Sequence, residues 1–278
     1  MKIRVGIVLL ACLLIFTDCS CSDLLTTQTA IQNITNKTIS AINIVSTFEL
    51  NSDFTDTLST DFTGSNITDW KGSRLIDISD KEMAMNMAIT TGPLVTTDKL
   101  YFLNGQEYLE TLNPSNTPSI WGSKTELNDK DWKQQTQIQF LSDLLNTAAK
   151  ISSLPDEKLN DVDCAVLIIT PTTQAAVDFV LSQFQFGGPA PFSMEGGATI
   201  TPDAYQGGAI TLWISLGNYL PVKVEAAFKF QNKENWSANS STTVITDNYH
   251  NELDFSNYNQ PVSLQVPPDV LAASDSGS

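Results

Sequence analysis

The sequence has few of the side chains on which most catalytic and metal sites depend. It contains one histidine, His250, in its 278 residues. A Ser-His-Asp or Cys-His set would have to use His250, which the strand pattern places on a polar face, and a zinc site would need clustered ligands. No phosphate-binding glycine loop occurs. We therefore predict no catalytic residues, no metal ligands and no cofactor, and a protein that is not an enzyme.

Cysteine is scarce as well. Cys12, Cys19 and Cys21 lie near the N-terminus, which leaves Cys164 alone in the rest of the chain. A lone cysteine cannot form a disulfide within its own domain, so an apolar core must hold the fold. The hydrophobic content of 41% can supply that core. Cys164 itself is predicted to be a small buried strand residue.

Basic residues are also few. The chain has 15 Lys and Arg against 31 Asp and Glu, for a net charge of −16. This charge repels phosphates, which argues against nucleic acid or an anionic membrane surface as an electrostatic partner. The acidity is most simply explained by the solubility of an exported protein. Catalysis by a carboxylate pair of the glycosidase kind stays open, although no pair stands out.

Residues 1–21 are predicted to be a signal peptide with a lipid-attachment site. A basic start precedes an apolar run over residues 3–16, which is too short to span a bilayer comfortably. The predicted lipid-anchor residues are Cys19 and Cys21, although Asp18 before Cys19 departs from the usual lipoprotein signal. Cleavage as a plain secretory peptide and retention as an uncleaved anchor are the alternatives. We expect an extracytoplasmic protein, attached to the cell membrane through the lipidated cysteine or secreted.

The clearest strand pattern runs from Ile210 to Gln231. Apolar residues alternate on both sides of Gly217-Asn218, two residues that tolerate the positive φ of a hairpin turn. The alternation predicts two antiparallel strands, each with one apolar and one polar face. The apolar face of the second strand comprises Leu220, Val222, Val224, Ala226, Phe228 and Phe230.

A strand meander is predicted to precede this hairpin, from Ile42 to Leu127. Its strongest signals are the alternating Met83, Met85 and Met87 and the hairpin turn Asn104-Gly105. The predicted strands cover residues 42–50, 54–62, 82–90 and 120–127, another strand lies within 67–78, and residues 99–109 form the hairpin.

Three helices are predicted between the strands. The first covers residues 24–37 and the second Asp129–Lys150, with Asn128 as its N-cap. The third covers Thr172–Phe184 and opens with the cap Thr170-Pro171. The remaining predictions are strands at 151–154, 164–170 and 243–255, and a Gly/Pro-rich loop from Gly187 to Gly208.

These elements and three motifs resemble the LolA/LppX-like prokaryotic lipoproteins, relatives of the outer-membrane lipoprotein carriers. The motifs are Asp161–Pro171, Leu212-Trp213-Ile214 with Asn218–Lys223, and Phe255–Val262. The resemblance covers residues 24–266 and departs at the imperfect lipoprotein signal and at the Gly187–Gly208 insertion. It implies an α+β, mainly β fold: a single curved antiparallel sheet (an incomplete β-barrel) with two or three helices on its concave face. Residues 22–268 would form this domain and 269–278 a disordered tail.

In that family the space between sheet and helices accepts the acyl chains of a lipid or lipoprotein. The resemblance therefore implies a monomeric, non-enzymatic protein that binds or carries a hydrophobic ligand, with acyl chains and the membrane as partners and no nucleic acid. Methionines suit a surface that repacks around a flexible ligand. The predicted ligand-binding residues are Met83, Met85, Met87, Phe102, Leu141, Leu145, Phe179, Leu212, Ile214, Val224 and Phe228.

The alternative is a surface-anchored interaction or sensor module that has the same fold but a filled core. It would bind a protein or an envelope polymer through outer-face residues such as Trp70, Trp121 or Trp236. A continuous apolar cavity between sheet and helices would favour the carrier, and close packing would favour the module.

Overall fold

The computed structural model describes residues 21–60, 64–112, 118–124, 129–184, 200–236 and 241–268. The predicted signal peptide with Cys19, residues 187–199 of the predicted 187–208 loop and the predicted tail at 269–278 lie outside these ranges. Cys21 is the first residue of a helix, but its side chain also lies outside what the structure describes.

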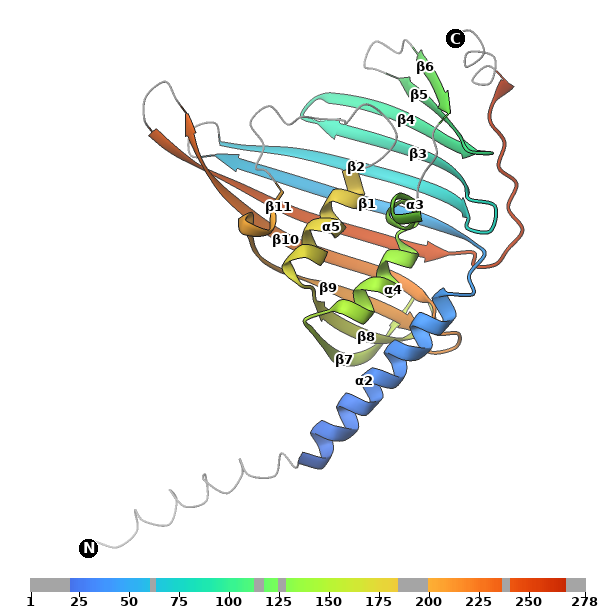
Figure 1. Cartoon of the computed structure of the whole chain (residues 1–278), viewed down its shortest axis with the longest axis vertical. Coiled ribbons are helices and arrows are strands. Elements are labelled where there is room, and N and C mark those ends of the chain that lie inside the picture. Colours follow the sequence, from blue (N-terminus) through green and yellow to red (C-terminus); the bar gives the residue numbers. More distant parts are fainter. Residues whose placement is uncertain are drawn as a thin grey trace, which may run out of the picture.

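Eleven strands form one antiparallel sheet, in the order β6-β5-β4-β3-β2-β1-β11-β10-β9-β8-β7 (Figure 1). Strands β6 and β7 are its two edges, so the sheet is an open, incomplete barrel. The strands are β1 (Thr47–Thr60), β2 (Gly64–Asp77), β3 (Glu82–Thr91), β4 (Leu94–Leu103), β5 (Gln106–Leu112), β6 (Pro118–Lys124), β7 (Lys150–Leu159), β8 (Val162–Thr170), β9 (Tyr205–Ser215), β10 (Pro221–Trp236) and β11 (Ser241–Ser256).

The helices lie on one face of this sheet. Figure 1 shows α3 (Asp129–Thr136), α4 (Ile138–Thr147) and α5 (Thr173–Phe184) across that face, called the concave face below. Helix α2 (Cys21–Ile42) packs beside α4 and β7, and a 3₁₀ turn, η1 (Pro202–Ala204), precedes β9. The predicted fold class is confirmed. Within the described ranges, no helix combines the length and apolarity that a membrane crossing requires.

Strand alternation produces the core, as the sequence predicts. Met83, Met85, Met87 and Ile89 of β3 are all buried on the concave face, because successive strand residues point to opposite faces. Cys164 is fully buried in β8, which confirms its prediction. The hairpin at Asn104-Gly105 is also confirmed, with positive φ at both residues.

The strands predicted at residues 42–50 and 54–62 are in fact one strand, β1, which begins only at Thr47, and Ile42 is the last residue of α2. The polar residues Asn51-Ser52-Asp53 suggest a turn in isolation. In the structure they pair with β2 on one side and with β11 on the other. Ladder hydrogen bonds to two neighbours therefore override the local turn preference.

The predicted helix Asp129–Lys150 is also wrong, because it is two helices that meet at Gln137. Gln137 has φ 58°, outside the helical range, and separates α3 from α4. Residue Lys150 belongs to β7. The cap of α5 is Thr172 rather than Thr170: its Oγ1 accepts a hydrogen bond from the N–H of Ala175 at 3.3 Å.

Two further details of the predicted turns and loops need correction. In the β9–β10 hairpin the residue with positive φ is Tyr219, at 60°, rather than Gly217 or Asn218. The Gly/Pro-rich loop ends earlier than predicted, because Gly207 and Gly208 lie within β9. There Gly208 lies against the backbone of Ala227 and Phe228 so closely that a Cβ would clash with both residues.

Candidate functional site

The concave face brings all eleven predicted ligand-binding residues into one buried core. They come from β3, β4, α4, α5, β9 and β10, and none is more than 9% exposed. Met83 lies opposite Phe102, and Leu212 lies opposite Val224. The two groups on the sheet are separated by β2, β1 and β11. The sequence therefore predicts the two sides of the concave face but omits its centre.

Aromatic side chains occupy that centre and connect it to the helices. Phe228 and Phe179 belong to the predicted set, whereas Phe54, Phe230 and Tyr249 were missed. Trp70 lies on the concave face, half-buried, so its predicted place on the outer face is wrong. The ring-centroid distances are Trp70–Phe54 4.9 Å, Phe54–Tyr249 5.7 Å, Tyr249–Phe230 5.6 Å, Phe230–Tyr205 5.6 Å, Tyr205–Phe228 6.3 Å, Phe228–Phe179 5.6 Å and Phe179–Phe140 5.8 Å.

Four polar residues interrupt this apolar surface on β1 and β11. Asp56, Asp247, Tyr249 and Asn251 are each at most 3% exposed, and strand alternation places all four on the concave face. Asp56 pairs with Tyr249, and Asp247 and Asn251 lie two residues to either side of Tyr249. We call these four residues the acidic cluster. Period-two alternation from Ile245 to Phe255 was the sequence signal that could have revealed its β11 members.

The acidic cluster has an unusual proton affinity. Burial, together with the nearby carboxylate of Asp247, raises the pKa of Asp56 from 3.8 to about 7. Burial and the two carboxylates also raise the pKa of the Tyr249 phenol above its ordinary range. Asp56 is therefore close to half protonated at neutral pH.

A second polar position links the sheet to the helices. Arg74 of β2 is buried, and its Nη1 donates a hydrogen bond to the backbone oxygen of Gln135 in α3 at 3.2 Å. Burial lowers the pKa of this guanidinium to about 9. At the α3–α4 break, Gln137 Nε2 donates to Ser182 Oγ at 3.1 Å and Gln137 Oε1 accepts from Gln183 Nε2 at 2.9 Å. Polar contacts thus hold α3, α4 and α5 in place.

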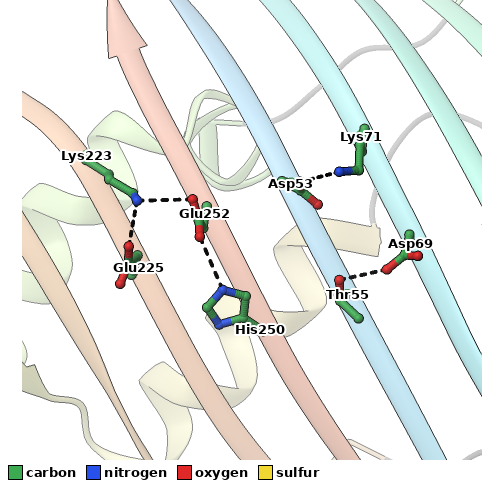
Figure 2. A network of polar contacts seen from close by, with 8 residues as sticks. All are labelled: Asp53, Thr55, Asp69, Lys71, Lys223, Glu225, His250 and Glu252. Atoms are coloured by element: carbon green, nitrogen blue, oxygen red, sulfur yellow. Dashed lines mark hydrogen bonds and ion pairs between the residues drawn. The ribbon is translucent and has the colours of Figure 1, made fainter. Parts of the chain in front are cut away.

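The outer face carries exposed ion pairs. Figure 2 shows Lys223 between Glu225 and Glu252, at 2.6 and 3.1 Å, with the helices behind the strands. The predicted exposed strand position of His250 is confirmed: its side chain is 53% exposed and its Nε2 lies 3.5 Å from Glu252. Exposed pairs of this kind contribute little to stability, about 1 kcal/mol or less each.

The same face also holds two open hollows. One, of about 490 Å³, is lined by residues of β11, β1, β2, β3 and β4, among them Asp53 and Lys71. The other, of about 420 Å³, is lined by residues of β1, β9, β10 and β11, among them Lys229 and His250. Both hollows combine polar and charged residues with apolar ones, which are Met87 and Ala88 in the first and Ala227 and Phe228 in the second.

Comparison with known proteins finds similarity in structure only. No protein-family model matches the chain, and no curated protein matches it in sequence. LprF from Mycobacterium bovis is 11% identical with a TM-score of 0.47, over 86% of this chain and 97% of that chain. The lipoprotein LppX from Mycobacterium tuberculosis is 11% identical with a TM-score of 0.42, over 85% and 99%. A LolA superfamily protein from Nitrosomonas europaea is 16% identical with a TM-score of 0.22, over 88% and 98%.

Proposed function

We propose that this chain is an extracytoplasmic, non-enzymatic protein that holds a hydrophobic, acyl-chain ligand between its half-barrel sheet and helices α3–α5. The observation that carries the proposal is the largely apolar concave face, which extends from β4 to β9 and is interrupted by the acidic cluster on β1 and β11. Six strand spacings of about 4.8 Å make this surface roughly 29 Å wide. A surface of that width can hold an extended acyl chain along most of its length.

The side chains at both ends of this surface suit a flexible ligand. Met83, Met85 and Met87 form one row on β3, and unbranched thioether chains adapt to varied shapes at low cost. At the other end, Phe179 of α5 contacts Phe228 of β10. The covering helices are short, with 8, 10 and 12 residues, and α3 and α4 meet at Gln137. A displacement of these helices would uncover the apolar surface without breaking the sheet.

Photo-crosslinking tests the location of the ligand. Protein purified without detergent is incubated with a palmitic acid analogue that carries a diazirine on its chain, irradiated and mapped by peptide mass spectrometry. We expect labels on the inward residues of β3 and β10, such as Met85 and Phe228. Outward residues of the same strands, Asn86 and Lys229, are the internal control. Labels confined to outward residues, or ligand-free protein that takes up no acyl probe, would refute the proposal.

We further propose that the protein is anchored through a lipid on Cys19 or Cys21. The support is the predicted signal peptide, which ends where α2 begins. The double variant Cys19→Ala, Cys21→Ala should move the protein from the membrane fraction to the soluble fraction, with Cys164→Ala as the control for loss of a thiol. Unchanged membrane retention of the double variant would exclude anchoring through these thiols.

The filled-core module is the second candidate, and one observation favours it. All eleven predicted ligand-binding residues are buried against one another and against the helices. Such burial is also what a closed core without a ligand requires. The crosslinking experiment separates the two functions, because a filled core leaves the inward residues of β3 and β10 unlabelled.

A further inference from the structure

The acidic cluster is an unusual set of residues for the interior of a half-barrel. Asp56 and Tyr249 face each other across β1 and β11, and Asn251 lies opposite Phe54 one step further along the ladder. Phe54 and Phe230 pack against the ring of Tyr249, with ring-centroid distances of 5.7 and 5.6 Å. The polar atoms are therefore embedded in the aromatic surface that the proposed acyl ligand would contact.

Asn251 leaves its hydrogen-bonding capacity unused within the described part of the chain. Neither its Oδ1 nor its Nδ2 has a hydrogen-bond partner there, although the residue is only 2% exposed. Oδ1 of Asp56 is in the same situation. Buried polar atoms without partners cost about 1–3 kcal/mol each, and native proteins contain few of them. An unmet acceptor and an unmet donor on one buried amide indicate a bound group that both donates and accepts.

The charges around the cluster exclude an anionic group. Across the described inward positions of β1, β10 and β11, no side chain is basic. Arg74, on β2, lies opposite Leu50, six residues from the position opposite Asp56, which is roughly 20 Å along the strand. A carboxylate or phosphate placed here would face Asp56 and Asp247 without a counter-charge.

We propose that the acidic cluster is the polar part of the ligand space, at the centre of the concave face, and binds an uncharged, hydroxyl-bearing head group such as the glycerol of a monoacylglycerol. The inference rests on the proposed acyl-binding function. A hydroxyl donates to Asp56 or Asn251 Oδ1 and accepts from Asn251 Nδ2. An ester oxygen can only accept, and an ammonium can only donate. A hydroxyl can therefore meet both unmet needs of Asn251, whereas an ester or an ammonium leaves one of them unmet.

Competition binding with ligands that share one acyl chain tests this assignment. Displacement of a fluorescent fatty-acyl probe is measured with 1-monopalmitoylglycerol, methyl palmitate, palmitate and palmitylamine. We expect monopalmitoylglycerol to bind at least roughly tenfold more tightly than methyl palmitate, the effect of one or two hydrogen bonds, one of them to a carboxylate. Palmitate should bind most weakly at pH 8, where Asp56 is mostly ionised.

Two matched variants test whether Asn251 causes the tighter binding of monopalmitoylglycerol relative to methyl palmitate. Asn251→Leu should abolish the tenfold preference while methyl palmitate binds as before. Asn248→Leu makes the same change on the exposed side of β11 and should keep the preference. The comparison of monopalmitoylglycerol with methyl palmitate on the wild-type protein tests the hydroxyl subsite even if Asn251→Leu does not fold.

Each remaining outcome overturns a different statement. Equal affinity of wild type for the glycerol ester and the methyl ester would refute the hydroxyl subsite and leave the acyl-binding function intact. Tightest binding of palmitylamine would refute the choice of an uncharged group. Failure of every palmitoyl compound to displace the probe, or of the probe to bind, would refute the acyl-binding function itself.

Discussion

Replacing Asp56 by asparagine should stabilise the protein at neutral and alkaline pH. The folded state raises the pKa of this carboxyl from 3.8 to about 7, so folding favours its protonated form. Below pH 3.8 both the folded and the unfolded states are protonated, and the ionisation costs nothing. As the pH rises from about 4 to 7 the unfolded state ionises first, and the folded state loses stability relative to it. Above pH 7 the full cost is present.

The size of this cost follows from the pKa shift. Each tenfold change in proton affinity is worth about 1.4 kcal/mol, so a pKa raised from 3.8 to about 7 costs about 4 kcal/mol at pH 8 and roughly half of that near pH 5.5. Asparagine has nearly the same shape and cannot ionise, so Asp56→Asn should recover most of this free energy at pH 8. In a domain of this size the gain corresponds to a rise in Tm of roughly 10 °C.

Urea unfolding of wild type and variant between pH 4 and pH 8 measures the effect. The other titrating groups are common to both proteins, so the difference in unfolding free energy isolates Asp56. Asp53→Asn, on the outer face of β1, is the matched control: its half-exposed carboxylate pairs with Lys71 at 2.6 Å, and we expect a change within about 1 kcal/mol. A pH-independent difference for Asp56→Asn, or a variant less stable than wild type at pH 8, would refute this reasoning.

Three more substitutions test the fold around the site, each measured by urea unfolding. Gly208→Ala should lower the unfolding free energy by about 3 kcal/mol, because its Cβ would meet the backbone of Ala227 and Phe228. Gly217→Ala is the control and should be tolerated, because its Cβ would have only Ser215 Oγ nearby, at 3.6 Å. Tyr258→Phe should cost about 1 kcal/mol through loss of the hydrogen bond that its hydroxyl donates to the Pro221 oxygen at 2.8 Å, and a neutral result would mean that water replaces that bond. Gln137→Ala should cost about 2 kcal/mol and increase amide hydrogen exchange in α4, since it removes the bonds to Ser182 and Gln183; unchanged exchange would show that these bonds do not hold the α3–α4 break.

Elements with a strong local signal were predictable from the sequence. The alternating methionines of β3 and the turn at Asn104-Gly105 both have local causes, residue period and positive φ, and both are found in the structure. The division of β1 was mispredicted because its polar centre is held by pairing with β2, the next strand along the chain, and with β11, which is distant in sequence. The break at Gln137 has no glycine or proline to mark it and depends on side chains of α5.

The candidate site was half predictable for a related reason. Apolar residues at alternate positions identified Met83 and Val224, since hydrophobic patterning marks the inward face. Asp247 and Asn251 have the same period as Ile245 and Tyr249, but a polar residue in an apolar series is ordinarily assigned to a turn or to the surface. Only the register of β11 against β1 shows that they meet Asp56 in the core.

The acidic cluster lowers the unfolding free energy of the protein, and the fold does not need these polar side chains to form. Leucine has the same number and branching of side-chain heavy atoms as asparagine, and at residue 251 it would remove two unmet hydrogen-bonding groups and add apolar contact with Phe54 and its neighbours. A purely structural core would therefore be more stable without Asn251, and without a carboxyl at residue 56. Stability and selective binding thus make opposite demands on these two residues: Asn251→Leu should unfold at a higher urea concentration and discriminate less between head groups. If Asn251→Leu were instead less stable than wild type, the amide would have a structural role and would not be explained by a ligand.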